Sequence, residues 1–236
     1  MSTGSPIAAR PPEFVLRAAP SFDTIDAASW DACANPPVAA RRSTTLGPGD
    51  DDPFNPFVCH AFLNALERSK SATGRAGWSP CPLLVEDSQG ELVACAPAYL
   101  KSHSMGEYVF DHAFADAYER AGGRYYPKLQ VAVPFTPVTG RRLLVRDGPN
   151  RERARDTLIG GLAALMRQAG ASSAHVTFAT KVDWNALAER GFLKRLDRQF
   201  HWLNADYRDF EDFLNALASR KRKVIRRERR DALRNG

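Results

Sequence analysis

The residues best suited to chemistry lie between Tyr125 and Gly140, where polar and aromatic side chains alternate with three prolines. Prolines confine such a segment to a sheet edge or to irregular backbone, yet the stretch is too apolar for a solvated loop. It would line a groove in which Lys128 offers a positive charge to a phosphate or carboxylate. The other groove residues would be Tyr125, Tyr126, Gln130, Phe135 and Thr136. Alternatively, the segment is an edge strand from which the Lys128 ammonium reaches water.

Two histidines and two carboxylates come close together just before this segment, between Ser102 and His112. Glu107 is the candidate general base, and with Lys128 it forms the expected catalytic set. Asp111 could also act as a base or orient a substrate amine, but it is equally well placed to cap a helix that follows. The spacing matches no standard metal site, so no bound metal is expected.

Other common catalytic patterns are absent from the sequence. There is no Gly-x-Ser-x-Gly, phosphate-binding loop or dinucleotide fingerprint. The four cysteines form no Cys-x-x-Cys motif, so they are expected to be reduced and mostly buried thiols. No serine or cysteine nucleophile can be matched with a histidine from spacing.

Positive charge is concentrated at the end of the chain. Residues Arg220 to Arg234 include nine Lys or Arg and two Asp or Glu, whereas the rest of the chain holds 24 basic and 25 acidic side chains. Arg222, Arg226 and Arg227 could therefore approach the phosphates of RNA or of anionic lipid. The alternative is a solvated linker helix. Aromatic residues do not interleave with these bases, which argues against single-strand RNA binding by stacking.

The chain that positions these groups alternates strands and helices, which predicts a mixed α/β domain. A proline- and glycine-rich loop is expected over 35–56, and a disordered tail over 1–12. Expected strands cover 13–19, 82–86, 92–96 with an extension to 101, 142–145, 174–179 and 192–204. Expected helices cover 24–34, 57–70, 111–121, 150–168, 182–190 and a basic helix from 209.

No stretch approaches the length of about 20 apolar residues that a membrane span requires, and no signal peptide is recognisable. The composition, 44% hydrophobic and 25% charged, is typical of a globular protein with a core. The chain is therefore expected to be cytoplasmic, with peripheral association at the inner face of the membrane left open.

The sequence from Gly106 to Gly140, with its Tyr-Tyr-Pro-Lys-Leu-Gln and Pro-Phe-Thr-Pro-Val-Thr-Gly blocks, resembles a bacterial family described as FemAB-like or GNAT-like and linked to peptidoglycan biosynthesis. The Pro53–Phe57 block and the basic Ser219–Lys223 run fit the same pattern. This resemblance implies a GNAT-like fold over 13–205, a mixed central sheet flanked by helices. Residues 206–236 would then form a basic helix leading toward a second domain beyond this chain.

The resemblance also implies an activity. Related Fem transferases move an aminoacyl group from tRNA onto an amine of a peptidoglycan precursor, so aminoacyl-tRNA or a lipid-linked cell-wall precursor would be the partner. A GNAT acetyltransferase instead holds coenzyme A on a glycine-rich turn. The corresponding segment 144–153 has one glycine, Gly148, and Pro149 removes a backbone N–H donor. Acetyl-CoA is therefore disfavoured as a cofactor.

Three functions remain open from the sequence. The first is a Fem-like acyl or aminoacyl transferase, and the second is a coenzyme A-dependent N-acetyltransferase. The third is a non-catalytic binding module that uses the basic helix for RNA or anionic lipid.

Overall fold

The computed structural model describes residues 13–36 and 54–235, which fall into two compact units. The first unit ends at Lys194 and the second begins at Arg195, whereas the sequence placed the division at residue 206. The tail expected over 1–12 and most of the loop expected over 35–56 lie outside the described residues.

The described strands of the first unit form two four-stranded sheets rather than the single central sheet expected from the sequence. One sheet has the order β1-β3-β4-β7 and is antiparallel, with β1 Val15–Ala18, β3 Leu83–Glu86, β4 Leu92–Ala96 and β7 Leu144–Val145. The other has the order β2-β5-β6-β8, with β2 Trp78–Pro80, β5 Ala98–Lys101, β6 Lys128–Val131 and β8 Ala174–Val176. Only its β6–β8 pair is parallel.

Pro97 separates the two sheets. The hairpin predicted for β3 and β4 is present, but the chain does not continue as one strand to Lys101. Proline cannot donate to a strand ladder, so the chain leaves the first sheet after Ala96 and enters the second at Ala98. This change of sheet brings Lys101 opposite Lys128.

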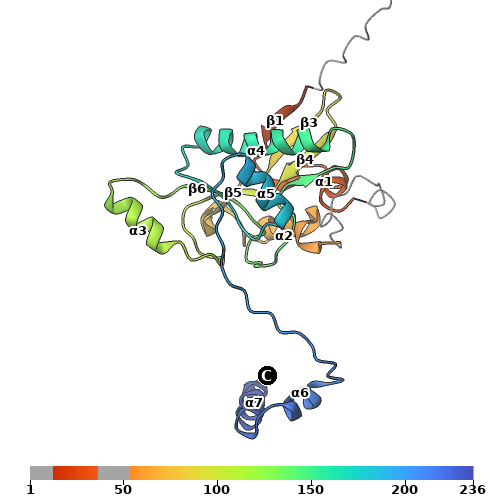
Figure 1. Cartoon of the computed structure of the whole chain (residues 1–236), viewed down its shortest axis with the longest axis vertical. Helices are drawn as coiled ribbons and strands as arrows, with labels where there is room; N and C mark the ends of the chain where they lie inside the picture. The colour runs from red at the N-terminus through yellow and green to blue at the C-terminus, as the bar shows by residue number, and fades with distance from the viewer. Residues whose placement is uncertain (1–12, 37–53, 236) are drawn as a thin grey trace, which may run out of the picture. The chain divides into compact units, whose positions relative to one another are not determined.

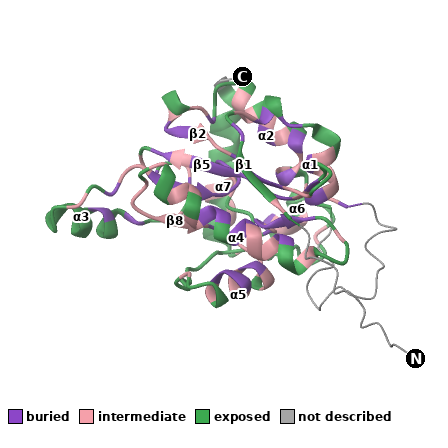
Figure 2. Cartoon of the chain, turned by 90° about the horizontal axis from the view of Figure 1, so that it is seen from above, coloured by how far each residue is buried: buried purple, intermediate pink, exposed green. Residues whose placement is uncertain are grey.

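Helices cover both faces of the first sheet (Figure 1). Alternate side chains of a strand point to opposite faces, so Leu83 and Val85 pack with one set of helices while Leu84 packs with the other. The first set is α4 Arg151–Gln168 and α5 Lys181–Glu189, and the second is α1 Ala27–Ala34 and α2 His60–Arg68. Figure 2 shows the buried and exposed faces that alternate along α4 and α5.

The remaining helices are shorter or lie outside this core. Helix α3 His112–Arg120 stands at one side of the first unit (Figure 1). Short 3-10 turns occur at Phe22–Thr24, Pro56–Val58, Gly74–Ala76 and Leu233–Asn235. None of the described helices is long and apolar enough to span a bilayer.

Two predictions for the last part of the chain differ from the structure. The strand expected over 192–204 does not form. Phe192 packs against the core, whereas the large apolar side chains from Leu193 to Leu203 are exposed. The single basic helix is instead two helices, α6 Phe210–Ala216 and α7 Ser219–Ala232. Leu217 takes an extended conformation at φ −84° and ψ 150°, which ends the first helix before the basic run begins.

Gly160 and Gly161, neighbours in α4, provide a matched test of this packing. A Cβ at Gly161 would lie 2.6 Å from Leu16 Cδ2 and 2.9 Å from the buried Leu83, whereas one at Gly160 would meet nothing within 4 Å. We expect Gly161→Ala to lower the free energy of unfolding by about 1–3 kcal/mol through overpacking. Gly160→Ala should raise it by up to about 1 kcal/mol, because alanine favours a helix interior. Urea denaturation of both variants distinguishes these outcomes, and equal effects would contradict the packing.

Candidate functional site: a buried lysine–carboxylate cluster

Two lysines occupy opposite positions on adjacent strands of the second sheet. Lys101 is the last residue of β5 and Lys128 the first of β6, and the antiparallel register makes them direct partners. Both are fully buried. Like charges directly opposite each other destabilise a strand pair, and a buried charge requires a charged or hydrogen-bonding partner. These strands therefore depend on anions supplied from elsewhere.

The connection between β5 and α3, residues 102–111, supplies two carboxylates. Lys128 Nζ lies 2.7 Å from Glu107 Oε2 and 2.5 Å from Asp111 Oδ2. Glu107 is 3% exposed and Asp111 1% exposed, so both ion pairs are shielded from water. Glu107 Oε1 also lies 3.9 Å from Lys101 Nζ, which places Glu107 between the two lysines.

Hydroxyl groups complete the cluster around Lys128. Its ammonium donates to Ser104 Oγ at 2.8 Å, and Ser104 Oγ is in turn 2.8 Å from the Tyr126 hydroxyl. Tyr125 donates its hydroxyl to Asp111 Oδ2 at 2.8 Å. We call these seven residues the lysine–carboxylate cluster: Lys101, Ser104, Glu107, Asp111, Tyr125, Tyr126 and Lys128.

Lys101 has a different environment from Lys128. Its ammonium lies 3.6 Å from the centre of the Trp78 ring and donates to the Met105 carbonyl at 3.2 Å. An aromatic face and a carbonyl stabilise a cation less than two carboxylates do. Burial lowers the pKa of Lys101 to about 8, although nearby Glu107 raises it.

The two carboxylates have opposite pKa shifts. Burial raises the pKa of Asp111, but hydrogen bonds from Lys128, Ser104 and Tyr125 outweigh that effect and lower it to about 2. Burial raises the pKa of Glu107 above its usual range, even though Lys128 and Lys101 both oppose this. Asp111 therefore stays ionised to lower pH than Glu107, which is the carboxyl that can take up a proton at milder pH.

Three buried oxygens of this region accept no hydrogen bond from the described residues: Glu107 Oε1, Asp111 Oδ1 and Gln130 Oε1. A buried acceptor without a donor costs about 1–3 kcal/mol. Strained or unsatisfied groups concentrate at functional sites. Glu107 Oε1 is thus a buried acceptor that has Lys101 Nζ at 3.9 Å but receives no hydrogen bond.

The structure brings together four of the residues selected from the sequence: Glu107, Tyr125, Tyr126 and Lys128. It does not place Lys128 in an open groove or in water, because this side chain is fully buried by its partners. Asp111 occupies the N-cap position of α3 but makes no capping hydrogen bond. Its carboxylate is used by Lys128 and Tyr125 instead.

The other three selected residues lie outside the cluster. Gln130 is buried and donates to Thr177 Oγ1 at 3.0 Å. Phe135 packs on Trp78 with ring centres 5.6 Å apart, and its N–H donates to Gly106, so it supports the segment that carries Glu107. The Thr136 hydroxyl donates to the Pro134 carbonyl and makes a local turn.

Sequence reasoning missed Lys101 and Ser104. The sequence signal for Lys101 was its place at the end of an apolar strand, shortly before two carboxylates. Its position opposite Lys128 depends on the register of β5 and β6, which no local sequence pattern specifies. Within the described chain, no group of three or more His, Cys, Asp or Glu side chains could hold a metal ion. All four cysteines are free thiols.

The arginines selected for phosphate binding belong to the second unit and differ in their contacts. Arg226 forms an ion pair with Glu211 at 2.5 Å, and Arg222 donates to Asn215 of α6 at 3.4 Å. Arg227 is exposed on α7. Two of the three thus help to join α6 to α7.

Comparison with known proteins identifies the family. A family profile described as peptidoglycan biosynthesis/recognition matches residues 21–236. The chain belongs to the FemAB-like family. No curated protein matches the FemAB-like chain. Among solved structures, an acetyltransferase from Trypanosoma brucei is 11% identical with a TM-score of 0.38, and the match covers 81% of the FemAB-like chain and 100% of that one.

Lys128 should be the residue on which the cluster depends most. In the FemAB-like chain, Lys128→Met leaves Glu107 and Asp111 buried without their shared cation, which should cost about 3–5 kcal/mol of unfolding free energy. Lys101→Met is the matched control, since Glu107 then retains Lys128, and its cost should be clearly smaller. Urea denaturation gives both values, and a Lys101→Met cost equal to or above that of Lys128→Met would contradict this arrangement.

The Asp111 carboxyl should titrate near pH 2, because the hydrogen bonds it accepts stabilise its ionised form. Its folded pKa is below the unfolded value of about 3.9. Asp111 therefore stabilises the fold above about pH 4, and that contribution is lost as the pH falls toward 2. Carbon-13 NMR of the side-chain carboxyl measures the midpoint directly. A midpoint close to 4 would show that Lys128 and Tyr125 do not hold this carboxylate in solution.

Proposed function

We propose that this chain is an acyl or aminoacyl transferase domain that acts on an amine of a peptidoglycan precursor. The family description supports a role connected with peptidoglycan. The observation that carries the transferase assignment is Glu107, a buried carboxyl with a raised pKa and one oxygen free of protein donors. Such a group suits general base catalysis near neutral pH.

The reaction requires a neutral amine. A lysine-type amine is protonated at neutral pH, with a pKa of about 10.4, so a base must remove its proton before or during attack. In our proposal Glu107 Oε1 accepts that proton. The amine nitrogen then forms a bond to the acyl carbon of an activated ester, the bond from that carbon to its leaving oxygen breaks, and the leaving oxygen takes up the second proton that the nitrogen gives up as the amide forms. The Lys128–Asp111 pair keeps the second Glu107 oxygen in position.

Substrate access would come through the segment that carries Glu107. Residues 102–111 both supply this carboxylate and cover it, with Met105 66% exposed and Tyr108 55% exposed. Gly106 and Tyr108 have positive φ angles of 79° and 55°, a conformation that is unfavourable for tyrosine. A local change of the backbone at Tyr108 would relax this residue and open Glu107 to an amine, while the ion pair with Lys128 keeps the Glu107 carboxylate in place. Such gating is common in enzymes that exclude water from the reaction.

We further propose that the first unit is a GNAT-like domain that does not use acetyl-CoA. The connection from β7 to β8 through α4 is the strand–helix–strand unit where a GNAT enzyme would hold the coenzyme. Here Gly148 and Pro149 precede α4, and Asn150 at its N-cap makes no side-chain capping bond. Proline at this point removes one of the backbone donors on which pyrophosphate binding depends.

The test is transfer of a labelled acyl group to a muramyl pentapeptide whose third residue carries a free amine. Aminoacyl-tRNA and acetyl-CoA are supplied as donors in separate reactions, and products are followed by mass spectrometry. We expect aminoacyl transfer that Glu107→Gln slows by about 10²–10⁴-fold, as loss of a general base does. The native rate should fall on acidification, because protonated Glu107 cannot accept a proton, with a midpoint above the usual glutamate pKa.

Glu119→Gln is the matched control. Glu119 is an exposed carboxylate on α3, so its replacement removes the same charge near the site without touching the cluster. Its rate should stay within about twofold of the native rate. Transfer that persists in Glu107→Gln, or an absence of product with either donor, would refute the proposal.

A further inference from the structure

The indole of Trp78 is a buried hydrogen-bond donor that the fold leaves without an acceptor. Trp78 is the first residue of β2 and is fully buried. Its Nε1–H donates to no atom of the described residues. The other fully buried tryptophan, Trp30 of α1, donates its Nε1–H to the Val58 carbonyl at 2.9 Å. A buried donor without a partner destabilises the fold, so such a group marks a candidate functional position.

This N–H lies against the segment that carries Glu107. The register of β2, β5 and β6 places Trp78 beside Lys101 and Lys128 on one face of the second sheet. A Cβ at Gly106, the residue before Glu107, would lie 3.3 Å from Trp78 Nε1. The two side chains also share a neighbour, because Lys101 Nζ lies 3.6 Å from the centre of the Trp78 ring and 3.9 Å from Glu107 Oε1. The buried donor and the buried acceptor therefore belong to one site.

An unpaired donor next to an unpaired acceptor matches the two groups that meet in acyl transfer. The attacking amine presents N–H groups, and the acyl group presents a carbonyl oxygen that becomes negative as the amine attacks. We infer that Trp78 Nε1–H binds this carbonyl oxygen while Glu107 Oε1 faces the amine. This inference rests on the proposed transfer, because that reaction brings an acyl carbonyl beside Glu107. It makes Trp78 a catalytic residue of the same site.

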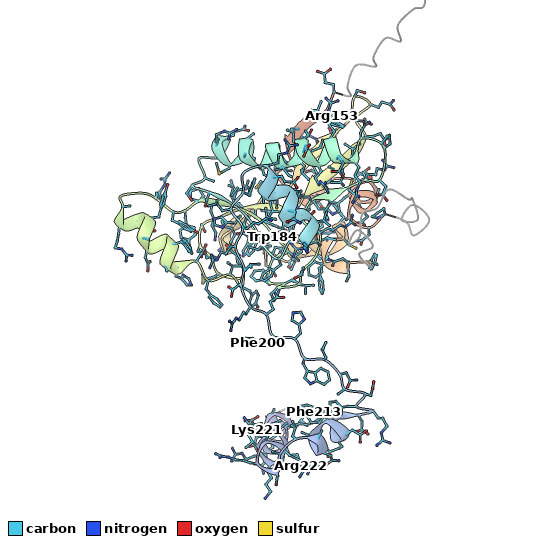
Figure 3. All side chains as sticks on the ribbon, viewed as in Figure 1. Arg153, Trp184, Phe200, Phe213, Lys221 and Arg222 are labelled. Carbon is cyan, nitrogen blue, oxygen red and sulfur yellow. The ribbon has the colours of Figure 1, made fainter. Side chains whose placement is uncertain are left out.

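Lys101 makes Trp78 a stronger donor. A cation over an indole ring attracts the electron density of the ring, which polarises the N–H bond, and its positive charge also favours an oxyanion nearby. Burial increases both effects, because water does not screen them. Trp184 of α5, labelled in Figure 3, gives the contrast: Lys194 Nζ lies 3.9 Å from its ring centre, but this indole is half-buried.

The Phe135 side chain separates this donor from solvent. Its ring centre lies 5.6 Å from that of Trp78, and Phe135 is 41% exposed whereas Trp78 is fully buried. A Cβ at Gly106 would lie 2.6 Å from Phe135 Cε1, so this ring packs directly on the glycine. Rotation of the Phe135 side chain would uncover Trp78 Nε1 without any movement of β2. The absence of a side chain at Gly106 leaves the space that a carbonyl group needs beside Nε1.

The kinetic test is Trp78→Phe in the full 236-residue chain, with the donors and the acceptor used to test the proposed transfer. Phenylalanine keeps an aromatic face for Lys101 but has no N–H. We expect kcat to fall by about 10²–10³-fold, as loss of one oxyanion donor does. KM should change little, because the interaction develops in the transition state. The acidic midpoint of the rate–pH profile should stay at its native position, since Glu107 and its partner Lys128 are intact.

Trp30→Phe is the matched control, since it shortens the other fully buried tryptophan and leaves the site untouched. Its kcat should stay close to the native value, and urea denaturation shows whether both variants fold. A native-like kcat in Trp78→Phe would overturn the inference. A shifted acidic midpoint would also overturn it, because the ring would then act through Lys101 and Glu107. Transfer that is lost in Glu107→Gln but kept in Trp78→Phe refutes this inference alone, whereas no transfer by the native chain refutes the proposed function.

A second measurement decides the inference without turnover. The indole ¹⁵N–¹H signals of the native chain are recorded with a muramyl pentapeptide whose third residue carries an acetylated amine, and then with the same peptide carrying the free amine. The Trp78 signal, assigned by its absence in Trp78→Phe, should move downfield with the acetylated peptide alone, because only that peptide offers the amide carbonyl. The Trp30 signal should not move, since its N–H is already bonded. A Trp78 signal that stays in place, or that moves equally with both peptides, would overturn the inference.

Discussion

The first unit depends on one electrostatic constraint, the placement of two buried lysines opposite each other on β5 and β6. Neither ammonium reaches water, so the strand pair is stable only if negative charge is brought to it. The chain between these strands supplies that charge at Glu107 and Asp111. The connection is thus bound to the sheet by ion pairs, and it holds Glu107 at the edge of the site.

This constraint also explains why α3 begins without a capping hydrogen bond from a side chain. Asp111 is the natural capping residue of that helix, and an aspartate cap is worth about 1 kcal/mol. Its side chain nevertheless leaves the helix end unsatisfied and accepts from Lys128 and Tyr125. A buried ammonium without a carboxylate costs several times more than a missing cap. The larger effect decides the geometry, and the helix starts without a side-chain cap.

Local patterns predicted the elements that local forces determine. The β3–β4 hairpin and helices α3, α4 and α5 were expected within a few residues of where they lie, because turn residues and apolar periodicity specify them. The division into two sheets was not expected, since it results from one proline at position 97 and from long-range pairing. For the same reason Glu107 and Lys128 could be selected as reactive types, but their contact and the role of Lys101 could not be derived. The strand expected over 192–204 had the right composition but has no partner strand in the structure.

The basic run at the end of the chain shows why net charge is a poor guide to a binding surface. Charge alone treats all of its lysines and arginines as equal candidates for phosphate. In the structure, three arginines of α7 contact side chains of α6. Arg222 donates to the Asn215 amide oxygen, Arg226 pairs with Glu211, and Arg229 lies over the Phe210 ring. These contacts add to the packing of Leu214, which is the buried residue of this short helix. Part of the positive charge in this unit therefore contacts α6, so the lysines and arginines of the run are not equivalent candidates for a ligand.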